Sequence, residues 1–422
     1  MNQTTELSMS DEVLTRRADE FLTILTDHAM DSNGIVRTML NARDLRPLRD
    51  EDISPTANLG VRECSLAEFV CYEDAAMTTG SLLAAVSMKY QRGGFSKDRE
   101  IARRAFRALK KIYDLGATKK PGFFPKPYGG RSSCHYSRDQ YLFCLAGFRA
   151  YREIADASEI AEMSEMALEM CRYWIEKDYH ADYFGLPPSS HLDDHMGSLF
   201  LGMMHLGWQL SGQSLLLQEY ERLCQSHALD RRMAQTLRDQ FRNGILYDGA
   251  MYFRQSENAL MMKTIAVDAL WDSENARRSS WVNALEKFWN EDLFVALDPS
   301  SGLNYYIVGY DRELDTTYLT EPKVIAELKN PLEFSELTWG GLRQRSGSAQ
   351  TAYASSVIAM RLGWEKAEVT ARQILGALSR DKFRGITVPS NSHIPPGSDW
   401  QLEIVHTEYM AMWLWAYYRI GR

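Results

Sequence analysis

The sequence lacks the features that would direct it to a membrane, to nucleic acid or into a secretory pathway. No segment approaches the roughly 20 uncharged apolar residues that a membrane-spanning helix needs. Lys and Arg number 48 against 56 Asp and Glu, and the formal net charge of −8 argues against a nucleic-acid or anionic-membrane partner. The N-terminus has neither the basic region nor the apolar region of a signal peptide, so we expect a cytoplasmic protein.

The signatures of several common chemistries are also missing. There is no G-x-S-x-G elbow, no Walker loop and no G-x-G-x-x-G after a strand. The six cysteines include no C-x-x-C pair, so we expect reduced thiols without a metal role. The sequence therefore predicts neither a metal nor a cofactor.

What the chain does have is an alternation of two kinds of helical segment. Small side chains let helix backbones approach closely, which suits an inner ring, whereas a charged face with one apolar stripe suits an outer ring in water. Segments rich in Ala, Gly and Ser span about 68–91, 137–155, 193–211, 259–272, 346–362 and 403–420. Segments rich in charge span about 12–30, 97–114, 158–178, 213–227, 274–290 and 364–379.

The connections between these segments are of two lengths. Short turns such as 92–96 and 362–363 follow the small-residue helices, and much longer stretches follow the charged ones. Loops much beyond ~15 residues are usually functional or disordered. In a ring of helical hairpins the six long connections lie at one end, where they would build a binding surface. Strand-like patches at 246–253 and 303–310 are expected to pair within them.

These features predict an all-α fold, an (α/α)6 toroid of six helical hairpins that uses residues 1–422 as a single domain. Short strand patches lie in the long loops at one end. The architecture resembles the six-hairpin glycosidase superfamily over almost the whole chain, without the signature of a specific family. The resemblance implies catalytic carboxylates at the mouth formed by the long loops. Such toroids also serve sugar epimerases, polysaccharide lyases and terpene cyclases, so the fold alone does not choose a reaction.

Asp139 is the first candidate acid. Ser137 and Gln140 have the spacing of a capping box, so a helix is expected to begin here with Asp139 in its first turn. The positions 4, 7 and 11 residues further on are apolar, which predicts that the carboxylate shares the inward face at the mouth. An acid in a first turn equally complements the helix dipole, so a structural role stays open. The adjoining residues expected to bind substrate are His135, Tyr136 and Arg138.

A second cluster, His191-Leu-Asp-Asp-His195, precedes the third small-residue helix. Two adjacent carboxylates cannot face the same way, so we expect Asp194 to act in catalysis and Asp193 to be the spare, beside a substrate-contacting His195. Two His residues in this order are weak evidence for a metal, and a helix-capping role stays open.

A third cluster lies before the last small-residue helix. Glu403 and His406 are three residues apart, so they are expected to share a helix face. Trp400 stands close by, and an indole ring beside carboxylates suits stacking on a sugar. The alternative is a core tryptophan and a surface pair.

Further residues are expected at the mouth. Glu73 and Asp74 are two of them, and Trp339 is expected to contact substrate. Arg343 and Arg345 are alternate residues of a stretch expected to be extended, so they would point the same way and hold a carboxylate or sulfate, as in a uronic-acid sugar. Solvated arginines are the plainer interpretation.

The leading hypothesis is a glycoside hydrolase that acts on an oligosaccharide. Asp139 would be the general acid and Asp194 or Glu403 the second carboxylate. Trp339, Trp400 and Tyr136 would form stacking walls. The alternatives are a lyase or epimerase centred on His135, Tyr136 and Arg138, and a non-catalytic sugar-binding protein. The sequence predicts no oligomeric state.

Overall fold

The computed structural model gives the chain as a set of packed helices with short strands. It describes residues 11–52, 64–181, 189–193, 196–236, 239, 250–252, 254–272, 275–293, 303, 307–311, 313–314, 316–319, 331–387 and 402–421. Among the helices described, none combines the length and the apolar character needed to cross a bilayer.

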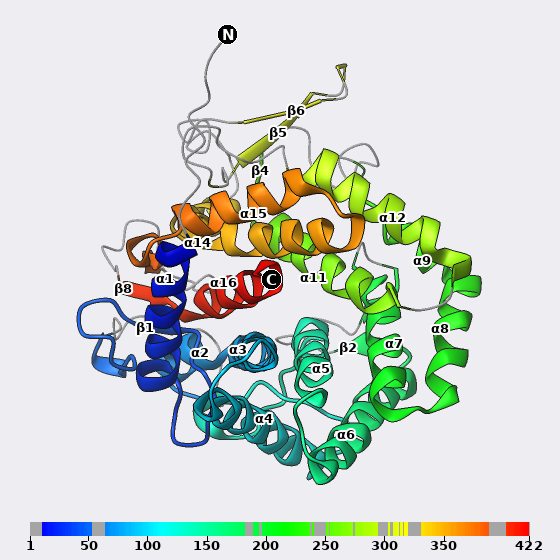
Figure 1. The fold of residues 1–422 in the computed structure, drawn as a ribbon, viewed down its shortest axis with the longest axis horizontal. Helices are drawn as coiled ribbons and strands as arrows, with labels where there is room; N and C mark the ends of the chain where they lie inside the picture. Colours follow the sequence, from blue (N-terminus) through cyan, green and yellow to red (C-terminus); the bar gives the residue numbers. More distant parts are fainter. Residues whose placement is uncertain are drawn as a thin grey trace.

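Six helices form a closed inner ring (Figure 1). Each contacts the next in the order α3, α5, α7, α11, α14 and α16, and α16 returns to α3. They lie in the six segments where the sequence predicts inner helices, so the expected all-α toroid is confirmed. Their bounds are α3 Ala75–Gln91, α5 Arg138–Arg152, α7 Leu199–Ser211, α11 Arg254–Leu270, α14 Pro331–Leu362 and α16 Thr407–Ile420.

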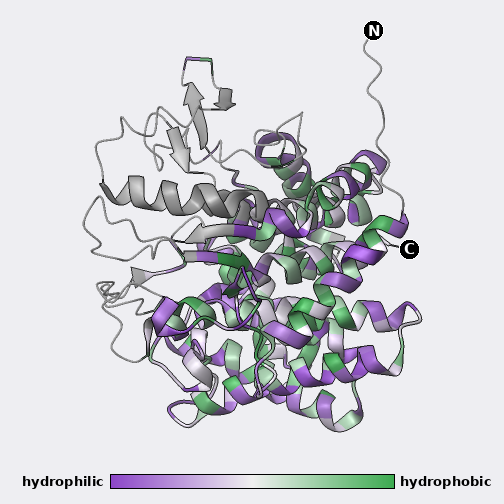
Figure 2. Ribbon diagram, turned by 90° about the vertical axis from the view of Figure 1, so that its left-hand side faces the viewer, coloured by the Kyte–Doolittle hydropathy of each residue, from purple (hydrophilic) through white to green (hydrophobic). Residues whose placement is uncertain are grey.

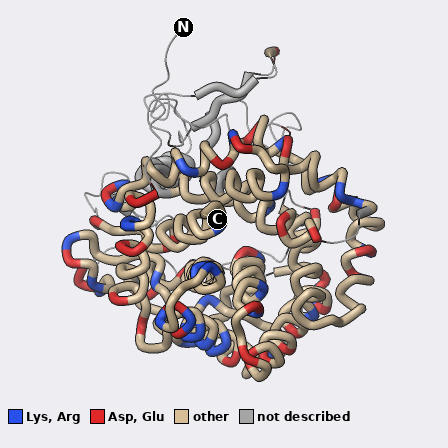
Figure 3. The backbone as a smooth tube through the Cα atoms, viewed as in Figure 1, with Lys and Arg blue, Asp and Glu red and all other residues tan. Residues whose placement is uncertain are grey.

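An outer layer of helices surrounds this ring, and each packs on an inner partner. Figure 3 shows many charged residues along these helices, and Figure 2 shows hydrophilic and hydrophobic residues interspersed, as in helices that bury one face. The outer helices are α1 Asp11–Thr23, α4 Ser96–Ala117, α6 Ala157–Glu176, α8 Ser214–His227, α12 Arg278–Lys287 and α15 Glu365–Ala377. Helix α1 continues as the π-helix Ile24–Ala29, and α12 as the π-helix Phe288–Leu293.

Glycines let the inner helices touch backbone to backbone. A Cβ added to Gly80 of α3 would lie 2.7 Å from the carbonyl oxygen of Phe143 in α5, and one added to Gly147 would lie 2.8 Å from the carbonyl oxygen of Gly80. Between α7 and α11, a Cβ on Gly202 would lie 2.6 Å from the Cα of Ala266. The small residues of the inner segments therefore set the width of the ring.

The long outer-to-inner connections pair with one another through short antiparallel strands. The strands β1 (Met39–Asn41), β8 (Leu402–His406) and β7 (Arg384–Thr387) form one sheet in that order. A second sheet has the order β4 (Ala250–Tyr252), β5 (Ile307–Asp311) and β6 (Thr316–Leu319), and a third pairs β2 (His180–Ala181) with β3 (Ser189–Ser190). The pairing of Met251 with Val308 confirms the expected contact between the patches 246–253 and 303–310.

Three segments differ from the expectation. The segment 68–91 is not one helix but two, α2 (Leu66–Tyr72) and α3, which begins only at Ala75. Helix α14 begins at Pro331, whereas the sequence predicts this helix only from about residue 346; proline is favourable at the first helical position. Glu403 and His406 lie in β8 rather than in a helix, because α16 begins only at Thr407. The β-branched Ile404 and Val405 favour a strand and are fully buried.

Replacing Gly80 by Ala is expected to lower the free energy of unfolding by roughly 1–3 kcal/mol, the usual cost of overpacking. The added Cβ meets a backbone carbonyl that cannot move without shifting α5. The matched control is Gly207→Ala in α7, where the nearest atoms, the Cys171 Sγ and the Leu216 Cδ1, belong to side chains rather than to the backbone. Denaturant unfolding measures both variants. Equal losses would contradict the backbone-contact explanation.

Candidate functional site

A pocket of about 420 Å³ opens where the N-terminal end of α5 meets α7 and α11. Part of its wall is apolar, with Met196, Ala259 and Met262. Its polar side chains come from the segment before α5 and its first turn, from the segment before α7, and from α11; they are Tyr136, Ser137, Arg138, Asp139, His191 and Asn258.

Asp139 reaches this pocket because α5 begins at Arg138, as the sequence predicts. The residue before it, Ser137, is extended, with φ −148° and ψ 150°, but its side chain makes no capping hydrogen bond. The expected capping box is therefore wrong. Gln140 Nε2 instead donates to the carbonyl oxygen of Glu73 at 2.7 Å, which ties the start of α5 to the segment before α3.

Asp74, directly before α3, lies in a cluster of carboxyl groups. Burial raises the pKa of Asp74 to about 8, with a further increase from the neighbouring Glu73 and then from Glu408 and Asp139. Lys126 opposes this increase: its Nζ lies 3.1 Å from Glu73 Oε1 and 3.8 Å from Asp74 Oδ1, and it is 1% exposed. A pKa of about 8 favours the protonated form of Asp74 at neutral pH. Asp74 is not among the residues that line the pocket, but its side chain is 20% exposed.

Glu408 is brought to this cluster by the sheet that joins the two ends of the chain. In the pairing of β1 with β8, Met39 lies opposite His406. The backbone N–H of Thr407 then donates to the carbonyl oxygen of Thr38 at 2.9 Å, which fixes the start of α16. Glu408 follows in the first turn of α16 and is buried.

Arg138 gives the pocket a cation. Its Nη1 lies 3.3 Å from the Nδ1 of His191 and 3.5 Å from the carbonyl oxygen of His191. The backbone N–H of His191 donates to the carbonyl oxygen of Tyr179 at 3.0 Å, and its ring meets Trp174 edge-on. Arg138 and His191 thus line the pocket beside Asp139, so that the carboxyl group of Asp139 has hydrogen-bond donors next to it.

His135 and Tyr136 lie on the same segment but take different positions. The His135 ring meets Tyr128 edge-on, with its Nδ1 3.4 Å from the tyrosine hydroxyl, and His135 is not among the residues that line the pocket. Tyr136 does line the pocket, but it is only 4% exposed and its hydroxyl bonds the carbonyl oxygen of His180. Tyr136 therefore belongs mainly to an aromatic core.

Two predicted acids lie in the solvent. Asp193 is exposed, and its carbonyl oxygen accepts a hydrogen bond from Arg232. Glu403 forms an exposed ion pair with Arg43 at 3.3 Å. Since residues three apart on a strand point to opposite faces, the expectation that Glu403 shares a face with His406 is wrong. His406 is buried, and its ring contacts Tyr409.

The remaining predicted residues divide into two groups. Trp339, Arg343 and Arg345 lie within α14, in a part for which only the backbone is described. Residues two apart on a helix do not face the same way, so the argument that paired the two arginines through an extended stretch is wrong. Asp194, His195 and Trp400 lie outside the described residues.

Sequence reasoning placed Asp74 at the mouth without a role and missed Lys126 and Glu408. A signal for Glu408 was available, because it occupies the first turn of an inner helix, as Asp139 does. Asp74 stands one residue before such a helix. Lys126 lies in a long connection and carries no pattern of its own.

Comparisons with known proteins give the fold. Neither a protein-family model nor a curated protein matches the chain. An "unsaturated glucuronyl hydrolase specific for heparin" has a TM-score of 0.54 at 11% identity over 97% of both chains. A "D-mannose isomerase" has 0.51 at 8% over 99% of both chains, and a "sugar epimerase from ruminal bacterium" has 0.50 at 13%, over 96% of this chain and 99% of its own. The chain therefore has the α/α toroid fold of the six-hairpin glycosidase-like enzymes.

Proposed function

We propose that this protein is a carbohydrate-active enzyme that cleaves a glycosidic bond with two carboxyl groups, Asp74 and Asp139. The observation that carries the proposal is the raised pKa of Asp74 in a cluster that includes Asp139. Glycosidic cleavage typically needs one carboxyl group that holds a proton and a second that acts as base or nucleophile, and different surroundings are what separate two such roles.

The division of labour follows from the surroundings of each group. Asp74 keeps its proton at neutral pH and donates it to the leaving oxygen of the substrate. Asp139, which lines the pocket, serves as the second carboxylate. The sequence alone favoured Asp139 as the general acid. The raised pKa of Asp74 favours Asp74 in that role instead, with Asp139 as the second carboxylate. Lys126 compensates the charge of Glu73 behind them.

The pocket favours an oligosaccharide with an acidic group. Arg138 presents a guanidinium beside Asp139, and a guanidinium binds a carboxylate or a sulfate well. The likeness in fold to a hydrolase named for heparin adds a reason to test acidic sugars first. On the opposite wall, Asn258 of α11 offers a side-chain amide that can form hydrogen bonds with the hydroxyl groups of a sugar.

Asp74→Asn and Asp139→Asn are each expected to keep the fold and to lose at least ~100-fold in rate, since general acid–base catalysis contributes about that much. The assay measures reducing ends released from an unsaturated heparin disaccharide, mannobiose and cellobiose. Glu403→Gln, which removes an exposed carboxylate paired with Arg43, is the control and is expected to leave the rate unchanged. A folded Asp74→Asn variant with the native rate would refute the role of Asp74.

Stability should depend on pH through Asp74 in an unusual direction. Its folded pKa lies above that of an unfolded carboxyl, so the folded state holds the proton more tightly. That stabilisation is complete below about pH 4 and is lost as the pH rises towards about 8. Asp74→Asn removes the ionisation. The melting temperature of the variant should therefore rise relative to that of the native protein as the pH increases from 5 to 8. A constant difference would contradict the shift.

A second candidate is a sugar epimerase or isomerase. His191 lines the pocket beside Arg138, and a buried His406 precedes Glu408, so the mouth also offers histidines for moving a proton at carbon. Such a reaction in D2O exchanges a carbon-bound hydrogen of mannose or cellobiose for deuterium without releasing reducing ends. Deuterium incorporation that His191→Asn abolishes would favour this candidate over hydrolysis. We expect cleavage without exchange.

A further inference from the structure

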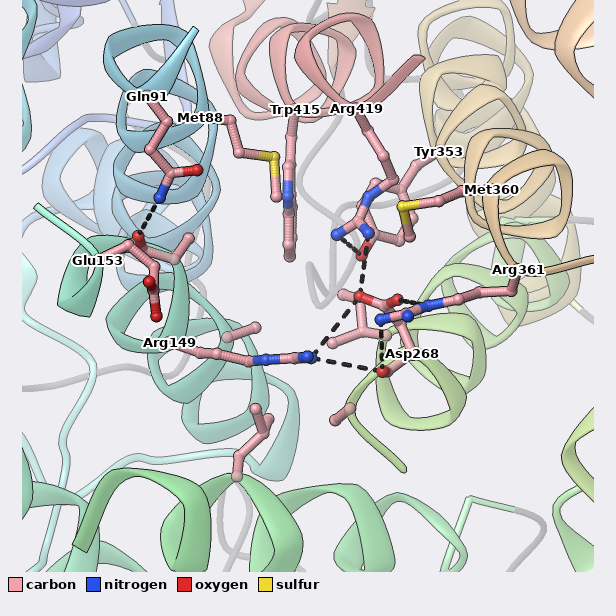
Figure 4. Close-up of a pocket in the computed structure, with 15 residues that line it drawn as sticks. Met88, Gln91, Arg149, Glu153, Asp268, Tyr353, Met360, Arg361, Trp415 and Arg419 are labelled. Carbon is pink, nitrogen blue, oxygen red and sulfur yellow. Dashed lines mark hydrogen bonds and ion pairs between the residues drawn. The ribbon is translucent and has the colours of Figure 1, made fainter. Parts of the chain in front are cut away.

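A second pocket, of about 310 Å³, lies at the opposite end of the ring from the mouth. It is built at the C-terminal ends of the inner helices, around Asp268 of α11 (Figure 4). Arg361 of α14 reaches Asp268 Oδ1 at 2.8 Å, and Arg419 of α16 reaches Oδ2 at 3.0 Å. Arg149 of α5 lies 3.9 Å from the same Oδ2.

The buried part of this pocket carries more positive than negative charge. The side chain of Arg419 is 5% exposed and that of Asp268 is 8% exposed, while Arg361 and Arg149 are 16% and 29% exposed. These arginines hold the pKa of Asp268 well below its usual range, against the effect of its burial. Three guanidinium groups therefore share one buried carboxylate.

The other nearby acids are in water. Asp272 bonds Arg149 at 2.7 Å and Arg361 at 3.3 Å, but its side chain is 51% exposed. Glu153 lines the pocket from the exposed end of α5. Solvent screens both of these charges, so they offset the buried excess only in part.

One donor in this cluster lacks a hydrogen-bond partner in the described part of the chain, although its guanidinium group lies over the rings of Tyr353 and Trp415. The Nε of Arg419 is buried and makes no hydrogen bond to any of the residues that the structure describes. The Nη atoms of Arg419 are satisfied by Asp268 and by the hydroxyl of Tyr353, at 3.0 and 3.1 Å. A buried charged donor left unsatisfied is costly, and such groups in native proteins call for an explanation.

Helix ends explain only part of this arrangement. The C-terminal end of a helix leaves carbonyl groups unbonded and attracts cations. Arg149 and Arg361 do donate to the carbonyl oxygen of Asp268 near the end of α11, each at 3.3 Å. That role accounts for two of the arginines, but not for the Nε of Arg419 or for the open volume that Arg419 lines with them.

We propose that this pocket binds a small organic anion, whose carboxylate or phosphate group lies against Arg149, Arg361 and Arg419. Trp415, Met88 and Met360 line the same space and provide an apolar surface for the rest of the molecule. The volume of the pocket limits the ligand to a small molecule. The site lies at the other end of the inner helices from Asp74 and Asp139, so it does not depend on the proposed function.

The test is titration calorimetry on the full chain at constant ionic strength, with benzoate and inorganic phosphate as probes. Saturable binding is expected at this pocket. Arg149→Gln is expected to weaken it at least about tenfold, because a charged hydrogen bond is lost. Tighter binding of benzoate identifies a carboxylate ligand with an apolar body, and tighter binding of phosphate identifies a phosphoryl group.

Two control variants locate the site. Arg152→Gln removes an exposed arginine of the same helix that bonds the carbonyl oxygen of Gln209, and it should leave the affinity unchanged. Arg138→Gln removes the arginine at the mouth, so the binding that remains in this variant is binding at the opposite end of the ring. Loss of binding in Arg138→Gln would assign the anion to the mouth and overturn the proposal. A native protein that shows no saturable binding would also overturn it, as would an Arg149→Gln variant that binds with native affinity.

Arg361→Gln repeats the measurement from another helix if Arg149→Gln does not fold. A footprint of the native protein with phenylglyoxal, which modifies arginine, gives an independent reading, because Arg149 is partly exposed. Slower modification of Arg149 in the presence of the bound probe supports the site, and an unchanged rate overturns it.

Discussion

The close contact between the backbones of the inner helices is the constraint on which the rest of this structure depends. Gly80 and Gly147 let α3 and α5 meet without side chains between them, and Gly202 does the same between α7 and α11. A ring that packs this tightly brings the first turns of its helices together over a small area. Asp139 and Glu408 come from the first turns of two other inner helices and still raise the pKa of Asp74, directly before α3. Bulkier residues at these contacts would move the acids apart into water, where Asp74 would keep the ordinary pKa of an aspartate.

The parallel direction of the inner helices gives the two ends of the ring opposite electrical character. Helix N-termini favour negative charge, and the mouth carries Glu73, Asp74, Asp139 and Glu408. Helix C-termini favour positive charge, and the far end carries Arg149, Arg361 and Arg419. Each end carries more charged side chains than the helix dipoles alone would favour. At the mouth the surplus is relieved by a proton on Asp74, and at the far end by Asp268, which is held ionised by the arginines around it.

The sequence contained enough information for the fold and only part of the site. Periodicity and small residues located all twelve helical segments, because the width of the ring is recorded locally in residues such as Gly80. The start of α5, and with it the position of Asp139 in the pocket, followed from the same local signals. Glu403 was misplaced because β8 is a strand formed by tertiary pairing: Glu403 pairs with Ile386 of β7, and the other edge of β8 pairs with β1, more than 350 residues earlier in the chain. The role of Asp74 depends on burial and on Lys126, which come from tertiary packing alone.

Lys126 determines how the negative charge is distributed between the carboxyl groups of Glu73 and Asp74. Its Nζ lies nearer to Glu73 than to Asp74, at 3.1 against 3.8 Å, so it compensates Glu73 first. A lysine placed closer to Asp74 would lower the pKa of that carboxyl and leave the mouth without a proton donor at neutral pH. Lys126 is itself fixed, because its backbone N–H donates to the carbonyl oxygen of His135 at 2.7 Å and its side chain is almost entirely buried. The segment between α4 and α5 thus has two effects. It places Asp139 at the pocket, and it holds the buried Lys126 far enough from Asp74 for that residue to keep a proton.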